Sequence, residues 1–107
     1  MQRELLKGSL DLMLLALLEH TPMYGYQIIK QLRAHSDDAL DIKEGSLYPA
    51  LHRLEHSGLV ESYWQPREDG VNRRYYQLTA QGRAALPERR REWNSFVTAV
   101  AGVLQHG

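Results

Sequence analysis

Segment 45–58 combines a helical repeat of apolar residues with signals for both ends of a helix. At about 100° per residue, Leu47, Ala50, Leu51 and Leu54 fall on one side. Pro49 fits only in the first turn of such a helix, and Gly58 is typical of the position just after its end. The segment therefore predicts a helix with one face for a core and an opposite polar ridge.

A β-hairpin is predicted directly after this helix. Segments 59–66 and 72–79 are rich in Val, Tyr, Trp and Leu, and the connection between them contains Asp69-Gly70, a strong turn signal. Upstream, apolar periodicity predicts a largely buried helix over 9–20 and an amphipathic helix over 23–35. The alternation at Leu40 and Ile42 predicts a very short strand.

The end of the chain carries an apolar seam at helical spacing. After Thr79, which we expect to cap the helix, the seam is formed by Trp93, Phe96, Val97, Val100, Val103 and Leu104. Pro87 is expected to start or bend this last helix. Because so short a helix is marginal in water, it should dock on its own domain or on a second subunit.

Composition excludes several classes of protein. The chain has 107 residues and no cysteine, which excludes a disulfide scaffold and a zinc ribbon and leaves little room for an enclosed active site. Its longest apolar run, 12–18, is much shorter than the roughly 20 residues of a membrane span. We therefore expect a cytoplasmic protein without cofactor, metal or membrane partner, and no enzyme.

The order helix, helix, short strand, helix, hairpin, helix is that of a winged helix-turn-helix. The expected fold is mainly α with a small β-hairpin, organised as a winged helix-turn-helix domain over 1–80 and a dimerisation helix over 81–107. Net charge is zero, but segment 43–91 carries nine basic and six acidic residues. A helix with a cationic ridge can enter the major groove of double-stranded DNA while a basic hairpin reaches the flanking backbone.

Several motifs make the sequence resemble the PadR family of transcriptional regulators. They cover about residues 5–85 and comprise Lys7-Gly8-Ser9-Leu10-Asp11, Met23-Tyr24-Gly25-Tyr26-Gln27-Ile28, Glu44-Gly45-Ser46-Leu47-Tyr48-Pro49-Ala50-Leu51-His52-Arg53-Leu54, Gly58-Leu59-Val60 and Arg74-Tyr75-Tyr76-Gln77-Leu78-Thr79. The resemblance implies a homodimeric, usually repressing regulator in which the third helix reads DNA and the last helix dimerises.

The resemblance also implies a set of DNA contacts. These are Lys43, Ser46, Tyr48, Pro49, His52 and Arg53 around the third helix, with Arg67, Arg73 and Arg74 on the hairpin. Tyr48 has a second interpretation as a packing aromatic that braces the hairpin, and Pro49 as helix-start geometry. The second interpretation of Arg53 is a side chain that is only solvated, or one that pairs with Glu44 or Glu55.

Strand alternation divides neighbouring hairpin residues between two faces. Arg73 and Arg74 should point to opposite sides, so that one of them contacts DNA, and the same rule sends one of Tyr75 and Tyr76 into the core.

Two further hypotheses compete with the regulator. His52-Arg53-Leu54-Glu55-His56 matches the H-x-x-E-H pattern of zinc peptidases, but five-residue matches arise by chance and such a site needs a third ligand and a cleft. The other is a winged-helix module that binds protein or a small aromatic molecule without DNA. Trp93 and Phe96 would then line a slot for an aromatic effector between two subunits, although a dimer core is the simpler interpretation.

Overall fold

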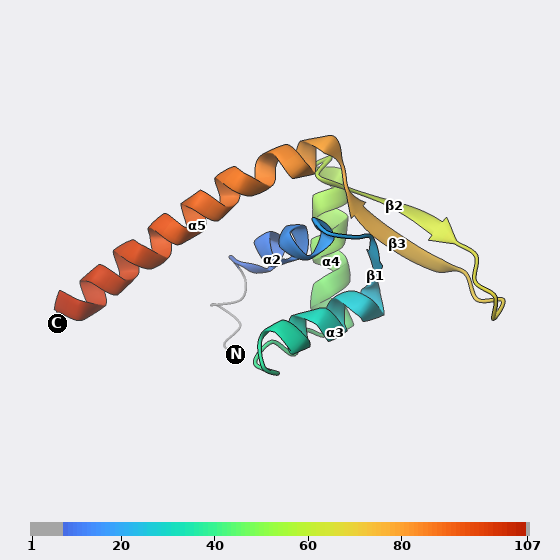
Figure 1. Ribbon diagram of the computed structural model, residues 1–107, viewed down its shortest axis with the longest axis horizontal. Helices are drawn as coiled ribbons and strands as arrows, with labels where there is room; N and C mark the ends of the chain where they lie inside the picture. The colour runs from blue at the N-terminus through green and yellow to red at the C-terminus, as the bar shows by residue number, and fades with distance from the viewer. Residues whose placement is uncertain (1–7, 107) are drawn as a thin grey trace.

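A small helical domain carries a hairpin on one side and a long helix on the other (Figure 1). The computed structural model describes residues 8–106, with principal extents of 58 × 29 × 21 Å. The predicted fold class is confirmed, because helices and a small antiparallel sheet follow one another in winged helix-turn-helix order. The elements are α2 (Leu10–Leu18), β1 (Met23–Tyr24), α3 (Gly25–His35), α4 (Glu44–His56), β2 (Val60–Gln65), β3 (Arg73–Leu78) and α5 (Ala80–His106).

The core lies where α2, α3, α4 and the first turns of α5 meet. Leu14, Leu15, Leu47, Leu51 and Leu86 are all fully buried there. The face of α4 predicted to be apolar is the buried one. Burial of these side chains, at roughly 1.5–3 kcal/mol each, is what holds the polar ridge of α4 in place from behind.

The sheet has three antiparallel strands in the order β1-β3-β2. β1 pairs Met23 with Tyr76 and Tyr24 with Tyr75. The short strand expected at 40–42 is therefore wrong, because the free edge of β3 is taken by the two residues before α3. The alternation at 40–42 has another cause, since Ile42 is buried in the core whereas Asp41 is exposed.

The ends of the predicted elements are fixed by specific residues. Gly58 follows α4 with φ of +79°, a conformation that favours glycine. Thr79 Oγ1 accepts a hydrogen bond from the Gly82 amide at 3.0 Å and donates one to the Gly58 carbonyl at 2.6 Å. The expected cap of the last helix is thereby confirmed, and the same side chain ties the end of α4 to the beginning of α5.

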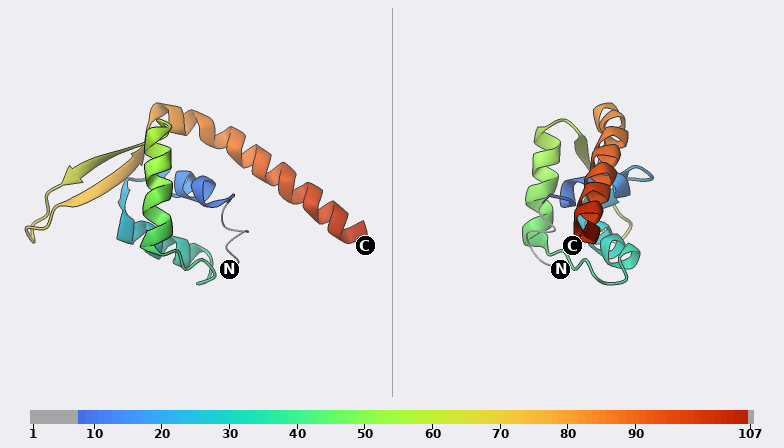
Figure 2. Two further views of the ribbon diagram at one scale, coloured as in Figure 1. Left: turned by 180° about the vertical axis from the view of Figure 1, so that it is seen from behind. Right: turned by 90° about the vertical axis from the view of Figure 1, so that its left-hand side faces the viewer.

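The last helix begins earlier than Pro87 would suggest. α5 runs from Ala80 through Pro87 to His106, so the expectation that Pro87 starts the helix is wrong. Its missing N–H leaves only the Arg83 carbonyl without a helical partner, and both residues are exposed to water. Figures 1 and 2 show the helix axis bending where α5 leaves the body of the domain.

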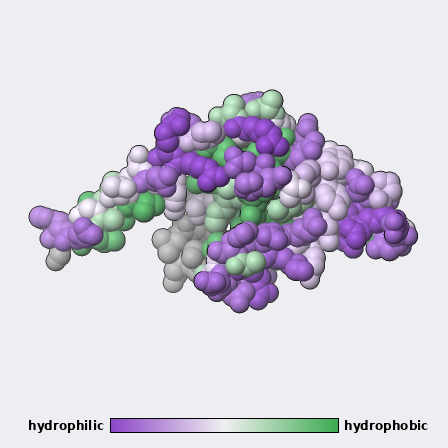
Figure 3. All heavy atoms as spheres, viewed as in Figure 1, coloured by the Kyte–Doolittle hydropathy of each residue, from purple (hydrophilic) through white to green (hydrophobic). Residues whose placement is uncertain are grey.

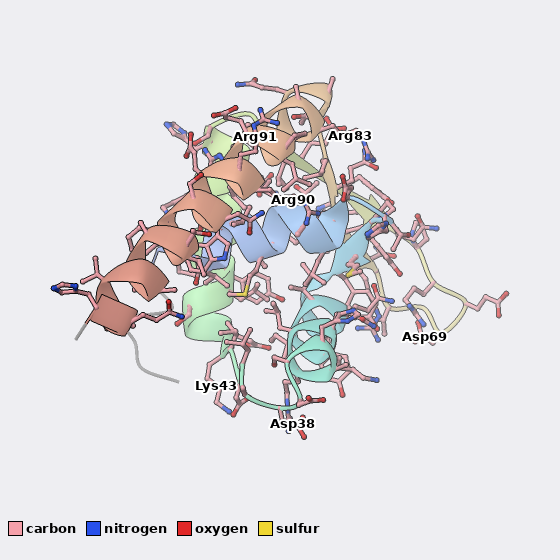
Figure 4. All side chains as sticks on the ribbon, turned by 60° about the vertical axis from the view of Figure 1, so that its left-hand side comes forward. Asp38, Lys43, Asp69, Arg83, Arg90 and Arg91 are labelled. Carbon is pink, nitrogen blue, oxygen red and sulfur yellow. The ribbon has the colours of Figure 1, made fainter. Side chains whose placement is uncertain are left out.

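Two arginines attach α5 to α2. Arg83 donates to the Glu19 carbonyl at 3.0 Å, and Arg90 donates to the Glu19 carboxylate at 3.1 Å. Both arginines are labelled in Figure 4. Together with the fully buried Leu86, these contacts hold the first part of α5 against α2. Within 8–106, no helix is both long enough and apolar enough to span a bilayer.

Candidate nucleic-acid interface

The outer face of α4 is the most prominent polar ridge next to the hairpin. It presents Ser46, Pro49, His52, Arg53 and His56, all of them exposed. Lys43 stands at the N-cap position just before the helix (Figure 4). Figure 2 shows no other helix or strand of residues 8–106 lying across the outer side of α4, and the five side chains are exposed.

Arg53 is held by a residue from another helix. Its Nη2 donates to Oδ1 of Asp11 at 3.0 Å, and the two side chains are 58% and 32% exposed. The alternative partners Glu44 and Glu55 are therefore wrong for Arg53. Asp11 lies in the first turn of α2, where the positive end of the helix dipole favours a carboxylate.

Lys43 has a local carboxylate partner. Its Nζ lies 2.9 Å from Oδ2 of Asp41, and both side chains are exposed. The hydrogen bond and positive charge from Lys43 lower the pKa of Asp41 below its ordinary value. Asp41 therefore stays ionised at neutral pH and screens part of the Lys43 charge.

Tyr48 is a packing residue as well as a surface residue. It is half-buried, and its hydroxyl lies against Gly25 at the start of α3, where any Cβ would overlap the ring. Gly25 therefore permits the close approach of α3 and α4. Tyr48 braces this helix crossing as well as facing the hairpin side of α4.

The hairpin arginines separate onto two faces, as alternation predicts. Arg74 lies on the α4 side, where Nη2 is 3.4 Å from Oε2 of Glu55 and Nε donates to Ser62 Oγ at 2.9 Å. Glu55 also accepts from Ser62 at 2.8 Å, so these three side chains join α4, β2 and β3.

Arg73 lies on the outer face of the sheet. Its guanidinium is 4.7 Å from the ring centre of Tyr24, and that of Arg67 is 5.9 Å from the same ring. Tyr24 and Tyr63 both contact Tyr75 on this face. Tyr76 points the other way and is buried, and burial raises the pKa of its phenol.

A concave surface lies between α4 and the hairpin. Its volume is about 380 Å³, and it is open to solvent. Trp64, 64% exposed, stands opposite Arg74 in the register of β2 and β3. The full lining is Tyr24, Gly25, Tyr48, His52, Trp64, Asn72, Arg73, Arg74 and Tyr76.

The two histidines and the glutamate of the H-x-x-E-H pattern do not form a common site. His52 and His56 are exposed on the ridge, whereas Glu55 is engaged by Ser62 and Arg74. Across residues 8–106, no three histidine or acidic side chains are grouped so as to hold a metal ion. Glu55 serves as a strut between α4 and the hairpin.

The outer half of α5 exposes the predicted apolar seam. Figure 3 shows hydrophobic residues on this arm beyond the body of the domain. The Trp93 and Phe96 rings lie 6.1 Å apart, and Phe96 is 60% exposed. Exposed fractions for the other members are 39% for Trp93, 45% for Val97, 39% for Val100 and 74% for both Val103 and Leu104.

Sequence reasoning missed three residues that shape this surface. Asp11 and Glu55 each bind an arginine from another element, and pairings of that kind have no local signal. Trp64 did have a local signal in the sequence, because it shares a strand face with Val60 and Ser62 but lies beyond the core. Strand alternation would have placed it on the α4 side.

Comparison with known proteins gives consistent matches. The model of the Transcriptional regulator PadR-like family matches residues 14–88. A transcriptional regulator of Mycobacterium tuberculosis is 36% identical over 104 residues, covering 97% of this chain and 94% of that protein. An uncharacterized protein of Lysinibacillus sphaericus is 34% identical over 90 residues, covering 84% and 83%.

Solved structures of similar chains extend these matches to three dimensions. A transcriptional regulator from Clostridium thermocellum has a TM-score of 0.85 at 31% identity, covering 95% of this chain and 96% of that one. A PadR family transcriptional regulator from Eggerthella lenta has a TM-score of 0.84 at 33% identity, covering 97% and 88%. The likeness includes the long α5, because coverage is nearly complete in each case.

Proposed function

Because this chain belongs to the PadR-like family of transcriptional regulators, we propose that it is a homodimeric repressor that binds a pseudo-palindromic DNA operator. Family membership confirms the resemblance that the sequence motifs carried. The proposal adds three points to it: direct DNA binding by α4 and the hairpin, association through α5, and repression by occupation of the operator.

The exposed ridge of α4 is the observation that carries the proposal. Its opposite face is anchored in the core, so the ridge is presented rigidly, with Lys43, His52 and Arg53 on one accessible surface. An α-helix fits the major groove of DNA, and arginine can bind the O6 and N7 edge of guanine with two hydrogen bonds. The hairpin beside the ridge supplies Arg67 and Arg73 for the neighbouring backbone.

A second copy of the chain is the occupant that we propose for the apolar face of α5. Trp93, Phe96 and Val100 recur on one side of the helix and are partly or largely exposed. A contiguous apolar patch of this kind is unfavourable in water and typically marks a protein interface. Two-fold pairing of these faces would place two α4 helices on one side of the dimer. Half-sites about 34 Å apart, one turn of duplex, would then match the protein symmetry.

The substitution Arg53→Ala tests the assignment of the reading helix. Losing a two-bond contact to guanine should weaken operator binding by about 1–3 kcal/mol for each half-site, a factor of about 5 to 150 per subunit. The measurement is fluorescence anisotropy on duplex DNA from upstream of the protein's own gene, against a shuffled duplex, at low and physiological salt.

Arg91→Ala provides the matched control for this experiment. Arg91 is 68% exposed on α5 and pairs with Glu88 on the same helix, so the variant removes the same charge away from the ridge. Operator affinity should be unchanged in this control. If Arg53→Ala also leaves affinity unchanged, α4 does not read DNA as proposed.

A further inference from the structure

The ion pair between Asp11 and Arg53 joins α2 to the ridge of α4. The two residues are 42 positions apart in sequence, yet Nη2 of Arg53 and Oδ1 of Asp11 lie 3.0 Å apart. Asp11 is the less mobile partner, because it is short, 32% exposed and carried by the first turn of a helix with a buried face. Arg53 is long and 58% exposed, so the pair restricts the arginine more than the aspartate.

The contact with Asp11 occupies only part of the Arg53 guanidinium. An arginine carries five N–H donors in a planar fork, and the pair with Asp11 uses Nη2 alone. A hydrogen-bonding edge with two donors is left for a ligand on the ridge. Such an edge matches the O6 and N7 atoms of guanine, and a fixed fork loses less entropy on binding than a free one.

We propose that Asp11 is a specificity-determining residue, which holds Arg53 for two-point recognition of a guanine and disfavours its use as a general phosphate contact. This inference rests on the proposed DNA-binding function. The orienting contact favours the base edge, and the negative charge of Asp11 beside the ridge opposes approach of any phosphate.

Two other carboxylates close to α4 are arranged differently. Asp41 pairs with Lys43 two residues away, and a lysine is a point charge that cannot form a planar fork. Glu55 binds both Arg74 and Ser62 and thereby holds the hairpin against α4. Asp11 alone among the three orients an arginine that projects from the ridge.

The test compares wild-type protein with Asp11→Asn on two duplexes of equal length. One is the duplex that wild-type protein selects from a randomised double-stranded pool, and the other is its shuffled sequence. Asp11→Asn should bind the shuffled duplex more tightly, and the ratio of the two dissociation constants should fall about fivefold, the upper range for an exposed ion pair. An unchanged or increased ratio would overturn the proposal.

Two further variants test whether the effect depends on the position of the Asp11 carboxylate and on the Arg53 guanidinium. Asp11→Glu keeps the charge at the helix terminus but moves the carboxylate by one methylene, and it too should lower the ratio. In an Arg53→Lys background, which has no fork, Asp11→Asn should leave the ratio unchanged. A fall in that background would show that Asp11 acts without Arg53 and would overturn the proposal.

Asp41→Asn is the control with the same charge change next to α4. It should tighten binding to both duplexes equally and leave their ratio unaltered, because Lys43 contacts phosphate irrespective of sequence. If Asp41→Asn lowers the ratio of dissociation constants as much as Asp11→Asn does, loss of negative charge alone explains the effect and the proposal is overturned. If wild-type protein selects no duplex from the pool, the proposed function itself fails, which is a distinguishable result.

Discussion

Two glycines of α5 lie in opposite surroundings. Gly82 is buried in the first turns, where a Cβ would overlap the backbone carbonyl of Leu59, the residue directly before β2. Gly102 is exposed near the end of the helix and has no atom within 4 Å of a Cβ placed there. At 100° per residue it also lies opposite the apolar face formed around Trp93. The two positions separate packing from helix propensity.

Gly82→Ala should destabilise the domain although alanine is the better helix former. Overpacking against fixed backbone costs about 1–3 kcal/mol, which exceeds the gain of up to about 1 kcal/mol in helix propensity. Gly102→Ala should instead stabilise the protein by about 0.5–1 kcal/mol. Urea unfolding followed by circular dichroism measures both, and a stabilised Gly82→Ala variant would contradict the close approach of α5 to the Leu59 backbone.

Single-residue orientations were predictable wherever a backbone period sets them. Alternation along β3 placed Arg73 and Arg74, and likewise Tyr75 and Tyr76, on opposite faces. The partners of the arginines were not predictable. Asp11 meets Arg53 only because the core fixes the crossing of α2 and α4, and no periodic pattern in either segment contains that information.

At the scale of elements, errors arose where tertiary pairing overrides a local signal. Met23–Tyr24 became β1 because β3 has a free edge there, whereas 40–42 has no strand beside it. Pro87 is accommodated inside α5 because one missing hydrogen bond on a solvated face is less costly than losing the buried contacts of Leu86. Amphipathic helices, α4 above all, were predictable because their periodicity and their tertiary burial agree. The predicted start of α4 was wrong, because the helix begins at Glu44 and Pro49 therefore lies inside it and not in its first turn.

Trp93→Ala should weaken association of the chain. Trp93 starts the apolar face of α5, and tryptophan is enriched among the interface hot spots whose truncation costs about 2 kcal/mol or more. The monomer–dimer dissociation constant, measured by sedimentation equilibrium, should therefore rise about thirtyfold. Thr98→Ala, exposed on the opposite side of the same helix, is the control that should leave it unchanged. Unaltered association of Trp93→Ala would remove this residue from the interface.

Charge balance is a property of the whole molecule with a direct consequence for DNA binding. The chain carries 13 basic and 13 acidic residues, and four of the five cations that we propose as DNA contacts have a carboxylate partner. These pairs are Lys43–Asp41, Arg53–Asp11, Arg67–Asp69 and Arg74–Glu55. A neutral protein with such pairs lacks the long-range field of a strongly basic one, so affinity has to come from short-range contacts after docking.

The salt dependence of binding should reflect these pairs. If Arg74 stays bound to Glu55 and Arg53 is directed to a base, Lys43, Arg67 and Arg73 of two subunits would neutralise phosphates. The slope of log affinity against log salt concentration would then be about −5. Glu55→Gln removes the partner of Arg74 and should steepen that slope by about 2, since one more cation per subunit becomes available. Anisotropy titrations over a series of sodium chloride concentrations measure both slopes. A slope near zero would contradict phosphate binding by this surface, and an unaltered slope in Glu55→Gln would mean that Arg74 does not reach the DNA.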